Sequence, residues 1–229
     1  ISDIFTLSGH PVVVVNYTGS IGNFLEPYEA RNFTEIFGND VATGIKFAER
    51  VLKAKFPHPI IVADSFGSLV GLAAIASGQV HPSLFIDDAG VVKPSAIFKG
   101  RQTLPPEYLL HYLRRVVQDL EQPLEPQNLF PRAKDVRFIF LHGAYDETAP
   151  CADVEQFVSR FNALHPNQSA QLWINAFVRH EVRDKRDYDF VLDALRGSLA
   201  PAYYIGNSCS ADYSFPGSAP SRRPTPGDH

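Results

Sequence analysis

One apolar stretch, residues 59–76, constrains the fold more than any other part of the chain. It begins with a run of β-branched residues without polar alternation and ends in a run that is apolar on every side at helical spacing. A strand without alternation is typical of a parallel sheet buried on both faces. Ser65 lies between the two runs. The stretch therefore predicts a buried parallel strand, a sharp turn that holds a serine, and a buried helix.

The serine has small neighbours two positions before and two positions after it. These are Ala63 and Gly67, and we expect the turn to be so crowded that a large side chain at either position would clash. In such a turn the serine lies at a helix N-terminus, where the N–H of Phe66 can stabilise a developing oxyanion. An ordinary serine in a glycine-rich turn has the same pattern. The apolar strand and helix on either side favour a nucleophile.

The pattern around Ser65 resembles the nucleophile elbow of the α/β-hydrolase family, Gly-x-Ser-x-Gly, with alanine in place of the first glycine. Further strands are predicted at 83–88, 136–141 and 171–177, with helical segments between them. Strands that alternate with helices indicate a mostly parallel sheet covered by helices on both faces. The resemblance implies the same α/β-hydrolase fold, over residues 1–200.

The resemblance also implies a catalytic triad. In this family a serine, an acid and a histidine follow one another along the chain, each in a loop after a strand. Asp146 follows strand 136–141 within Gly-x-x-Asp-x-x-x-Pro, a pattern that the family often has at its acid, and His180 follows strand 171–177. A serine hydroxyl needs a base to remove its proton, and an acid orients that base. Ser65, His180 and Asp146 are the predicted nucleophile, base and acid, and the Phe66 N–H is half of the oxyanion hole.

Alternatives stay open for two members of this triad. Asp146 also fits a turn or helix-capping aspartate, because the residues after it signal a helix start. Asp88, or its neighbour Asp87, is the rival acid, since thioesterase domains of peptide and polyketide synthases place theirs after this earlier strand. His180 also fits a histidine in a surface loop. His142 fits the base less well, because it precedes the predicted acid.

The second oxyanion donor depends on how the first part of the chain is aligned. The β-branched run at 11–17 predicts a strand, and a helix is predicted to begin at Asn39 or Asp40. We align the run with the family's fourth strand. The first three strands, and the loop that normally carries the second donor, would then lie upstream, so we expect the native protein to contain further residues there. In the competing alignment the run is the third strand, and Tyr17 or Thr18 supplies this N–H.

Two segments lie outside the predicted sheet. Residues 91–131 are an insertion where the family has a lid over the active site. Within it Pro106 can open a helix with one apolar stripe, which three later prolines would close. A plain crossover helix has the same stripe. From residue 201 the composition shifts to Ser, Gly and Pro, so 201–229 is predicted to be a flexible tail.

The composition argues against several classes of protein. The 229 residues suffice for one substantial domain, and the net charge of −4 gives no argument for nucleic acid or an anionic membrane as a partner. No apolar run approaches the roughly 20 residues of a membrane helix, and no signal peptide is evident at the start. We therefore expect a cytoplasmic location. Two cysteines exclude a disulfide framework but not a single bridge.

These observations and the resemblance predict a serine hydrolase that cleaves a small-molecule ester or thioester through an acyl-enzyme. No residue spacing indicates a metal site, no glycine pattern indicates a nucleotide site, and the family uses no cofactor for this chemistry. One alternative is a biosynthetic thioesterase or acyltransferase. Another is a non-catalytic protein of the same fold that binds a small ligand or partner. Neither the substrate nor the oligomeric state follows from the sequence.

Overall fold

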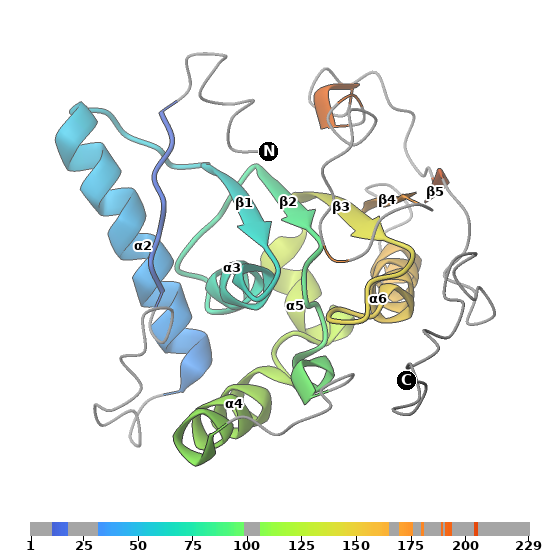
Figure 1. The fold of residues 1–229 in the computed structure, drawn as a ribbon. Coiled ribbons are helices and arrows are strands. Elements are labelled where there is room, and N and C mark those ends of the chain that lie inside the picture. The colour runs from blue at the N-terminus through green and yellow to red at the C-terminus, as the bar shows by residue number, and fades with distance from the viewer. Residues whose placement is uncertain are drawn as a thin grey trace, which may run out of the picture.

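The computed structural model describes residues 11–17, 32–98, 106–164, 170–175, 180, 189, 191–193 and 204–205. Its centre is a five-stranded sheet whose strands lie in chain order and pair in parallel (Figure 1). The strands are β1 (Ile60–Asp64), β2 (Leu84–Asp88), β3 (Arg137–Gly143), β4 (Gln171–Asn175) and β5 (Tyr204–Ile205). The first four confirm the strands predicted between residues 59 and 177. The two-residue β5, within the predicted tail, was not foreseen.

Helices cover the sheet on both faces. On one face stand α2 (Phe33–Leu52), α3 (Gly67–Ala76), α5 (Pro126–Ala133) and α6 (Cys151–Leu164), each in contact with the next. Residues 191–193, which are also helical, lie on the other side of the sheet in Figure 1, and Val191 is fully buried there. No helix in the described part of the chain is long and apolar enough to cross a membrane.

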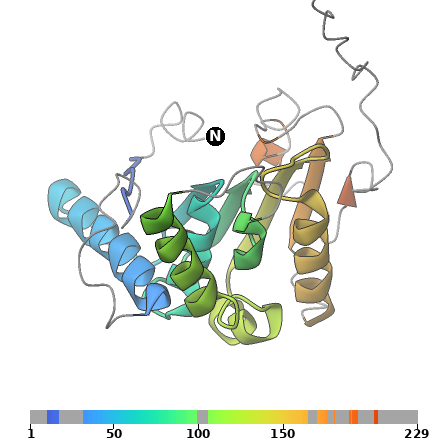
Figure 2. The same ribbon diagram turned by 60° about the horizontal axis from the view of Figure 1, so that its bottom comes forward.

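The insertion contributes two more elements beside this layer. The 3-10 helix η2 (Pro94–Phe98) and α4 (Glu107–Leu120) pack against each other, and α4 also packs against α2 (Figure 2). α4 begins after Pro106 and buries Leu113 and Val116, as predicted. The later prolines were expected only to end this helix. Instead Pro126 begins α5, at a position where the missing N–H has no acceptor to lose.

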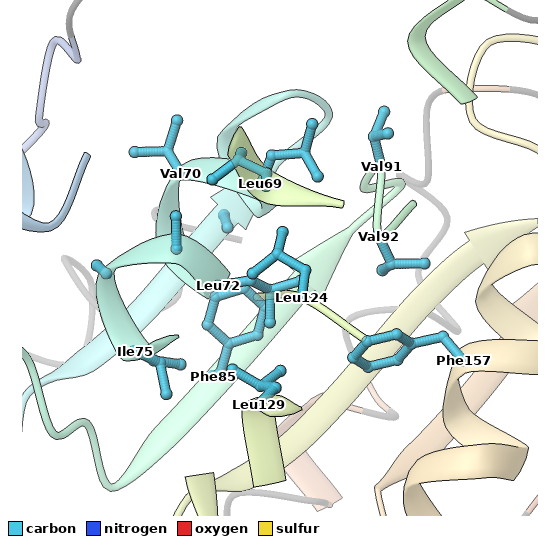
Figure 3. Close-up of a cluster of buried hydrophobic side chains, with 14 of the residues drawn as sticks. Leu69, Val70, Leu72, Ile75, Phe85, Val91, Val92, Leu124, Leu129 and Phe157 are labelled. Atoms are coloured by element: carbon cyan, nitrogen blue, oxygen red, sulfur yellow. The ribbon is translucent and has the colours of Figure 1, made fainter. Parts of the chain in front are cut away.

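Helix α3 is the centre of the core. It is apolar on every side, so it needs neighbours all round, and every residue from Ser68 to Ile75 is buried. Helices α2 and α5 flank it, and β1 and β2 lie behind it. Figure 3 shows Leu72 of α3 beside Phe85 of β2, with Leu124 and Leu129 of the insertion close by. The apolar run predicted from the sequence thus forms the most enclosed element of the described structure.

The prediction that β1 is buried on both faces is wrong for the described structure. Ile60 and Val62 are 42% and 37% exposed, whereas Ala63 is buried. β1 is the first strand of the sheet and pairs only with β2 among the described strands. Its β-branched residues therefore cover the core from one side only.

Residues 11–17 do not form the predicted strand. The segment carries no strand hydrogen bonds, and Val12, Val13 and Val14 are exposed. Val15 packs instead against Gly44 of α2. β-branched residues favour a strand only where a neighbouring strand supplies the ladder and the packing.

Helix α2 begins earlier than the sequence predicted. The side chain of Asn32 accepts a hydrogen bond from the Thr34 N–H at 2.8 Å and caps the helix, seven residues or more before the expected caps. The first turns bury Phe33 and Phe37, and Gly38 lies where an added Cβ would collide with Ser77. Close packing against the C-terminal end of α3 therefore explains a glycine inside this helix.

The two glycines of α3 have different surroundings. Among the described residues, no atom lies within 4 Å of a Cβ added at Gly67, so these residues do not produce the crowding expected there. A Cβ added at Gly71 would lie 2.6 Å from the ring of Phe85 and 3.4 Å from Ile61. The crowding lies one turn further along the helix, where α3 crosses the strands.

We predict that Gly71→Ala lowers the free energy of unfolding by about 1–3 kcal/mol, because the methyl group must displace a fully buried ring. Gly67→Ala is the matched control on the same helix. It should leave stability unchanged or raise it slightly, since alanine is the better helix former. Urea unfolding followed by circular dichroism measures both. Equal effects of the two substitutions would contradict the packing described here.

Candidate active site

The turn after β1 holds Ser65 in a strained backbone conformation. Its φ is 53°, in the left-handed region that residues with a side chain rarely adopt. Two backbone hydrogen bonds fix it: Ser65 N–H donates to the carbonyl of Asp88, and Val91 N–H donates to the carbonyl of Ser65, both at 3.1 Å. The end of β2 and the loop after it thus fix both the N–H and the carbonyl of Ser65.

The structure brings together the three side chains that the sequence predicted as a triad. Ser65 Oγ lies 2.8 Å from His180 Nε2, and His180 Nδ1 lies 2.8 Å from Asp146 Oδ2. Because Nδ1 faces a carboxylate, the ring hydrogen belongs on Nδ1, and Nε2 is left to accept the serine hydroxyl hydrogen. The Asp146 side chain is fully buried, while that of His180 is 31% exposed.

Asp146 makes the contacts expected of a turn aspartate and also those expected of an acid that orients a histidine. Its Oδ1 accepts hydrogen bonds from the N–H groups of Thr148 and Ala149, each at 2.8 Å, as a turn aspartate does. Its Oδ2 accepts from His180. The two backbone hydrogen bonds fix the orientation of the carboxylate, with Oδ2 directed toward His180.

The backbone N–H of Phe66 lies where the serine turn leads into α3. Phe66 is the N-cap residue of α3, and its N–H has no acceptor among the described residues. The ring of Tyr17, whose N–H is the alternative donor, stacks on that of Phe66 with centroids 5.5 Å apart. Burial, with a smaller effect of Asp64, raises the pKa of the Tyr17 hydroxyl. Thr18, the other candidate, lies outside the described residues.

The rival acids lie under the serine turn. Asp88 is 9% exposed and holds Ser65 through its backbone carbonyl. Asp87 is fully buried; its Oδ1 accepts the Ser68 hydroxyl, and its Oδ2 accepts the Gly90 N–H at 3.1 Å. A Cβ at Gly90 would collide with both Asp87 and Ser68. These residues form a fastening unit, Ser68–Asp87–Gly90, between α3 and the loop after β2.

The sequence analysis missed this fastening unit. It considered Asp87 only as a rival acid, although a carboxylate within a predicted buried strand, three residues before a glycine, was a signal for a buried polar contact. Burial raises the pKa of Asp87 to about 7, despite the opposing hydrogen bonds from Ser68 and Gly90; Asp88 and Asp64 add to the rise. Among the described residues no three His, Cys, Asp or Glu side chains are grouped to hold a metal ion.

The parallel sheet and the serine turn are those of the α/β-hydrolase fold, which the chain has. A puromycin-hydrolyzing peptidase from Mycobacterium tuberculosis superposes with a TM-score of 0.51 at 17% identity, covering 72% of this chain and 25% of that one. An acylaminoacyl peptidase from Pyrococcus horikoshii gives 0.51 at 18% identity, covering 78% and 30%. A puromycin hydrolase gives 0.50 at 15% identity, covering 71% and 24%.

The chain therefore spans only about a quarter to a third of the length of these similar proteins. No protein-family model matches the chain, and no curated protein matches its sequence.

We predict that Asp87 makes the protein less stable as the pH rises from about 4 to about 7. The folded state keeps a proton on Asp87 up to about pH 7, whereas the unfolded carboxyl loses it near its ordinary value of 3.8. The folded state thus binds more protons in this interval, so the free energy of unfolding falls with pH, by up to a few kcal/mol, and levels off above the interval.

The Asp87→Asn variant isolates this effect, because it cannot titrate. The stability of the natural protein minus that of Asp87→Asn, from urea unfolding at each pH, should decrease between pH 4 and 7. The exposed Asp135→Asn serves as the matched control and should keep the pH dependence of the natural protein. A flat difference for Asp87→Asn would show that this carboxyl is not held protonated.

Proposed function

We propose that this protein is a serine hydrolase in which Ser65 is the nucleophile, His180 the general base and Asp146 the acid that orients it. The observation that carries the proposal is the unbroken series of two 2.8 Å hydrogen bonds from Ser65 Oγ through His180 to Asp146. The strained backbone at Ser65 adds support, because such strain is typical of catalytic turns.

The reaction follows from this geometry. Ser65 Oγ attacks the substrate carbonyl carbon while its proton passes to His180 Nε2, and Asp146 stabilises the imidazolium that forms. The tetrahedral oxyanion accepts a hydrogen bond from the Phe66 N–H at the start of α3. Collapse breaks the bond to the leaving group, which takes the proton from His180. Water then attacks the acyl-enzyme by the same steps and releases the acid.

The scissile bond is, in our proposal, an ester or thioester. A second candidate is an amide, because the similar structures include proteins described as peptidases. A biosynthetic acyl transfer would use the same acyl-enzyme with another alcohol, thiol or amine in place of water. Activity on p-nitrophenyl acetate, an acyl thioester and a peptidyl p-nitroanilide, with the product acid measured, separates these outcomes.

The insertion at 91–131 is proposed to cover the substrate. Its first residue, Val91, donates the backbone hydrogen bond that holds Ser65, and η2 begins three residues later. A cover attached so directly to the serine turn would lie over the substrate's acyl group. A helix packed only for stability would leave substrate preference unchanged when its exposed residues are altered.

We predict that Ser65→Ala abolishes labelling by a fluorophosphonate probe and hydrolysis of p-nitrophenyl acetate, because the attacking oxygen is gone. Circular dichroism should show an unchanged fold. Labelling that survives in the folded variant would end the assignment of Ser65. Absence of labelling in the natural protein, with its fold intact, would favour the non-catalytic binding protein.

The two candidate acids are separated by a matched pair of substitutions. Asp146→Asn should lower kcat on the order of 10³–10⁴-fold, because the amide favours the wrong tautomer of His180. Asp88→Asn should have a much smaller effect, since the contact of Asp88 with Ser65 is made by its backbone carbonyl. The reverse ranking would support the arrangement of the synthase thioesterase domains instead.

A further inference from the structure

A second histidine contacts the proposed acid from the side opposite the solvent. His142 belongs to β3, lies four residues before Asp146 and is fully buried. Its Nε2 lies 2.7 Å from the carbonyl oxygen of Ala149 and 3.3 Å from Asp146 Oδ2. The carboxylate oxygen that faces His180 is therefore shared with a second imidazole.

The surroundings of His142 define its protonation state. Nε2 faces a carbonyl and a carboxylate, so Nε2 carries the ring hydrogen. Nδ1 is buried without a hydrogen-bond partner among the described residues. Burial lowers the pKa of His142, and the charge of His180 lowers it further, against the opposing effects of Ala149 and Asp146. The imidazole of His142 is therefore neutral. Its single N–H group, at Nε2, faces the Ala149 carbonyl of the Asp146 turn.

We propose that His142 is a positioning residue that holds the Asp146 carboxylate toward His180; this inference rests on the proposed function. Asp146 Oδ1 accepts hydrogen bonds from the N–H groups of Thr148 and Ala149, while His142 Nε2 donates one to the Ala149 carbonyl. The turn is thus fastened from both ends. With Oδ1 occupied, Oδ2 can only face the two imidazoles.

A space-filling role would not require an imidazole at this position. A buried nitrogen without a partner costs stability, and a phenyl ring would fill the same volume without that cost. An imidazole that is present despite this cost in stability indicates that the hydrogen bond from Nε2 has a role. Loss of that hydrogen should affect the reaction more than the stability of the fold.

The test compares His142→Phe, which keeps the ring but removes the donor, with His142→Gln, whose side-chain amide reaches as far as Nε2. In the full chain, His142→Phe should lower kcat for p-nitrophenyl acetate roughly 10–100-fold with little change in KM, because the acid is misplaced. Fluorophosphonate labelling should slow equally. His142→Gln should restore most of both rates.

The pH dependence gives a readout that a purely structural role would not move. In His142→Phe the displaced Asp146 carboxylate would stabilise a protonated His180 less, so the pH of half-maximal kcat/KM on the acid side should fall. It should stay in place in His142→Gln and in the control His81→Phe. His81 is exposed and precedes the N-terminal end of β2, whereas Ser65 follows the C-terminal end of the parallel strand β1.

The outcomes separate this inference from the proposed function. If the natural protein reacts with neither probe, the proposed function fails and the inference fails with it. If the natural protein reacts and His142→Phe reacts equally fast with an unchanged pH profile, only the inference is overturned. Should His142→Phe not fold, nitrogen NMR of the natural protein decides: a neutral ring protonated on Nε2 supports the inference, and one protonated on Nδ1 refutes it.

Discussion

The left-handed backbone at Ser65 is the constraint on which the site depends. A residue with a side chain in that region costs of order 1–3 kcal/mol, so the surrounding structure has to over-determine it. Here the end of β2 and the loop after it do so, because the Ser65 N–H donates to the Asp88 carbonyl and the Ser65 carbonyl accepts from the Val91 N–H. Asp87 holds that same loop against α3 through Ser68 and Gly90. The buried carboxylate thus supports the serine without contacting it.

Most of the sheet and the three site residues could be predicted because their signals are local. Short, mostly apolar runs between helical segments predict the strands, and Ser65, Asp146 and His180 each follow such a run. The edge position of β1 and the unpaired segment 11–17 could not be predicted in this way. Whether a strand is buried or paired depends on which segments lie beside it, and that information is not in the run itself.

Contacts of single residues were harder to predict. The sequence analysis treated a turn aspartate and a catalytic acid as alternatives at Asp146, but one carboxylate oxygen accepts the turn N–H groups and the other faces His180, so the two are compatible. His142 fits the base less well because it precedes the acid, and its contact with Asp146 from the end of β3 could not be read from the order of residues along the chain. No described residue crowds a Cβ at Gly67, the glycine of the motif, whereas Phe85 crowds one at Gly71.

The distances along the chain between the site residues also affect how the enzyme would form. Ser65 and His180 are separated by 115 positions, and Asp146 and His180 by 34. Contacts between such remote residues require closure of long loops, which slows their formation relative to local structure. The serine turn depends on β1, α3, the end of β2 and the loop after it, whereas the complete triad also needs β3 and β4 in register. During refolding, catalytic activity should therefore appear later than helix content, because it requires that all of these strands have paired.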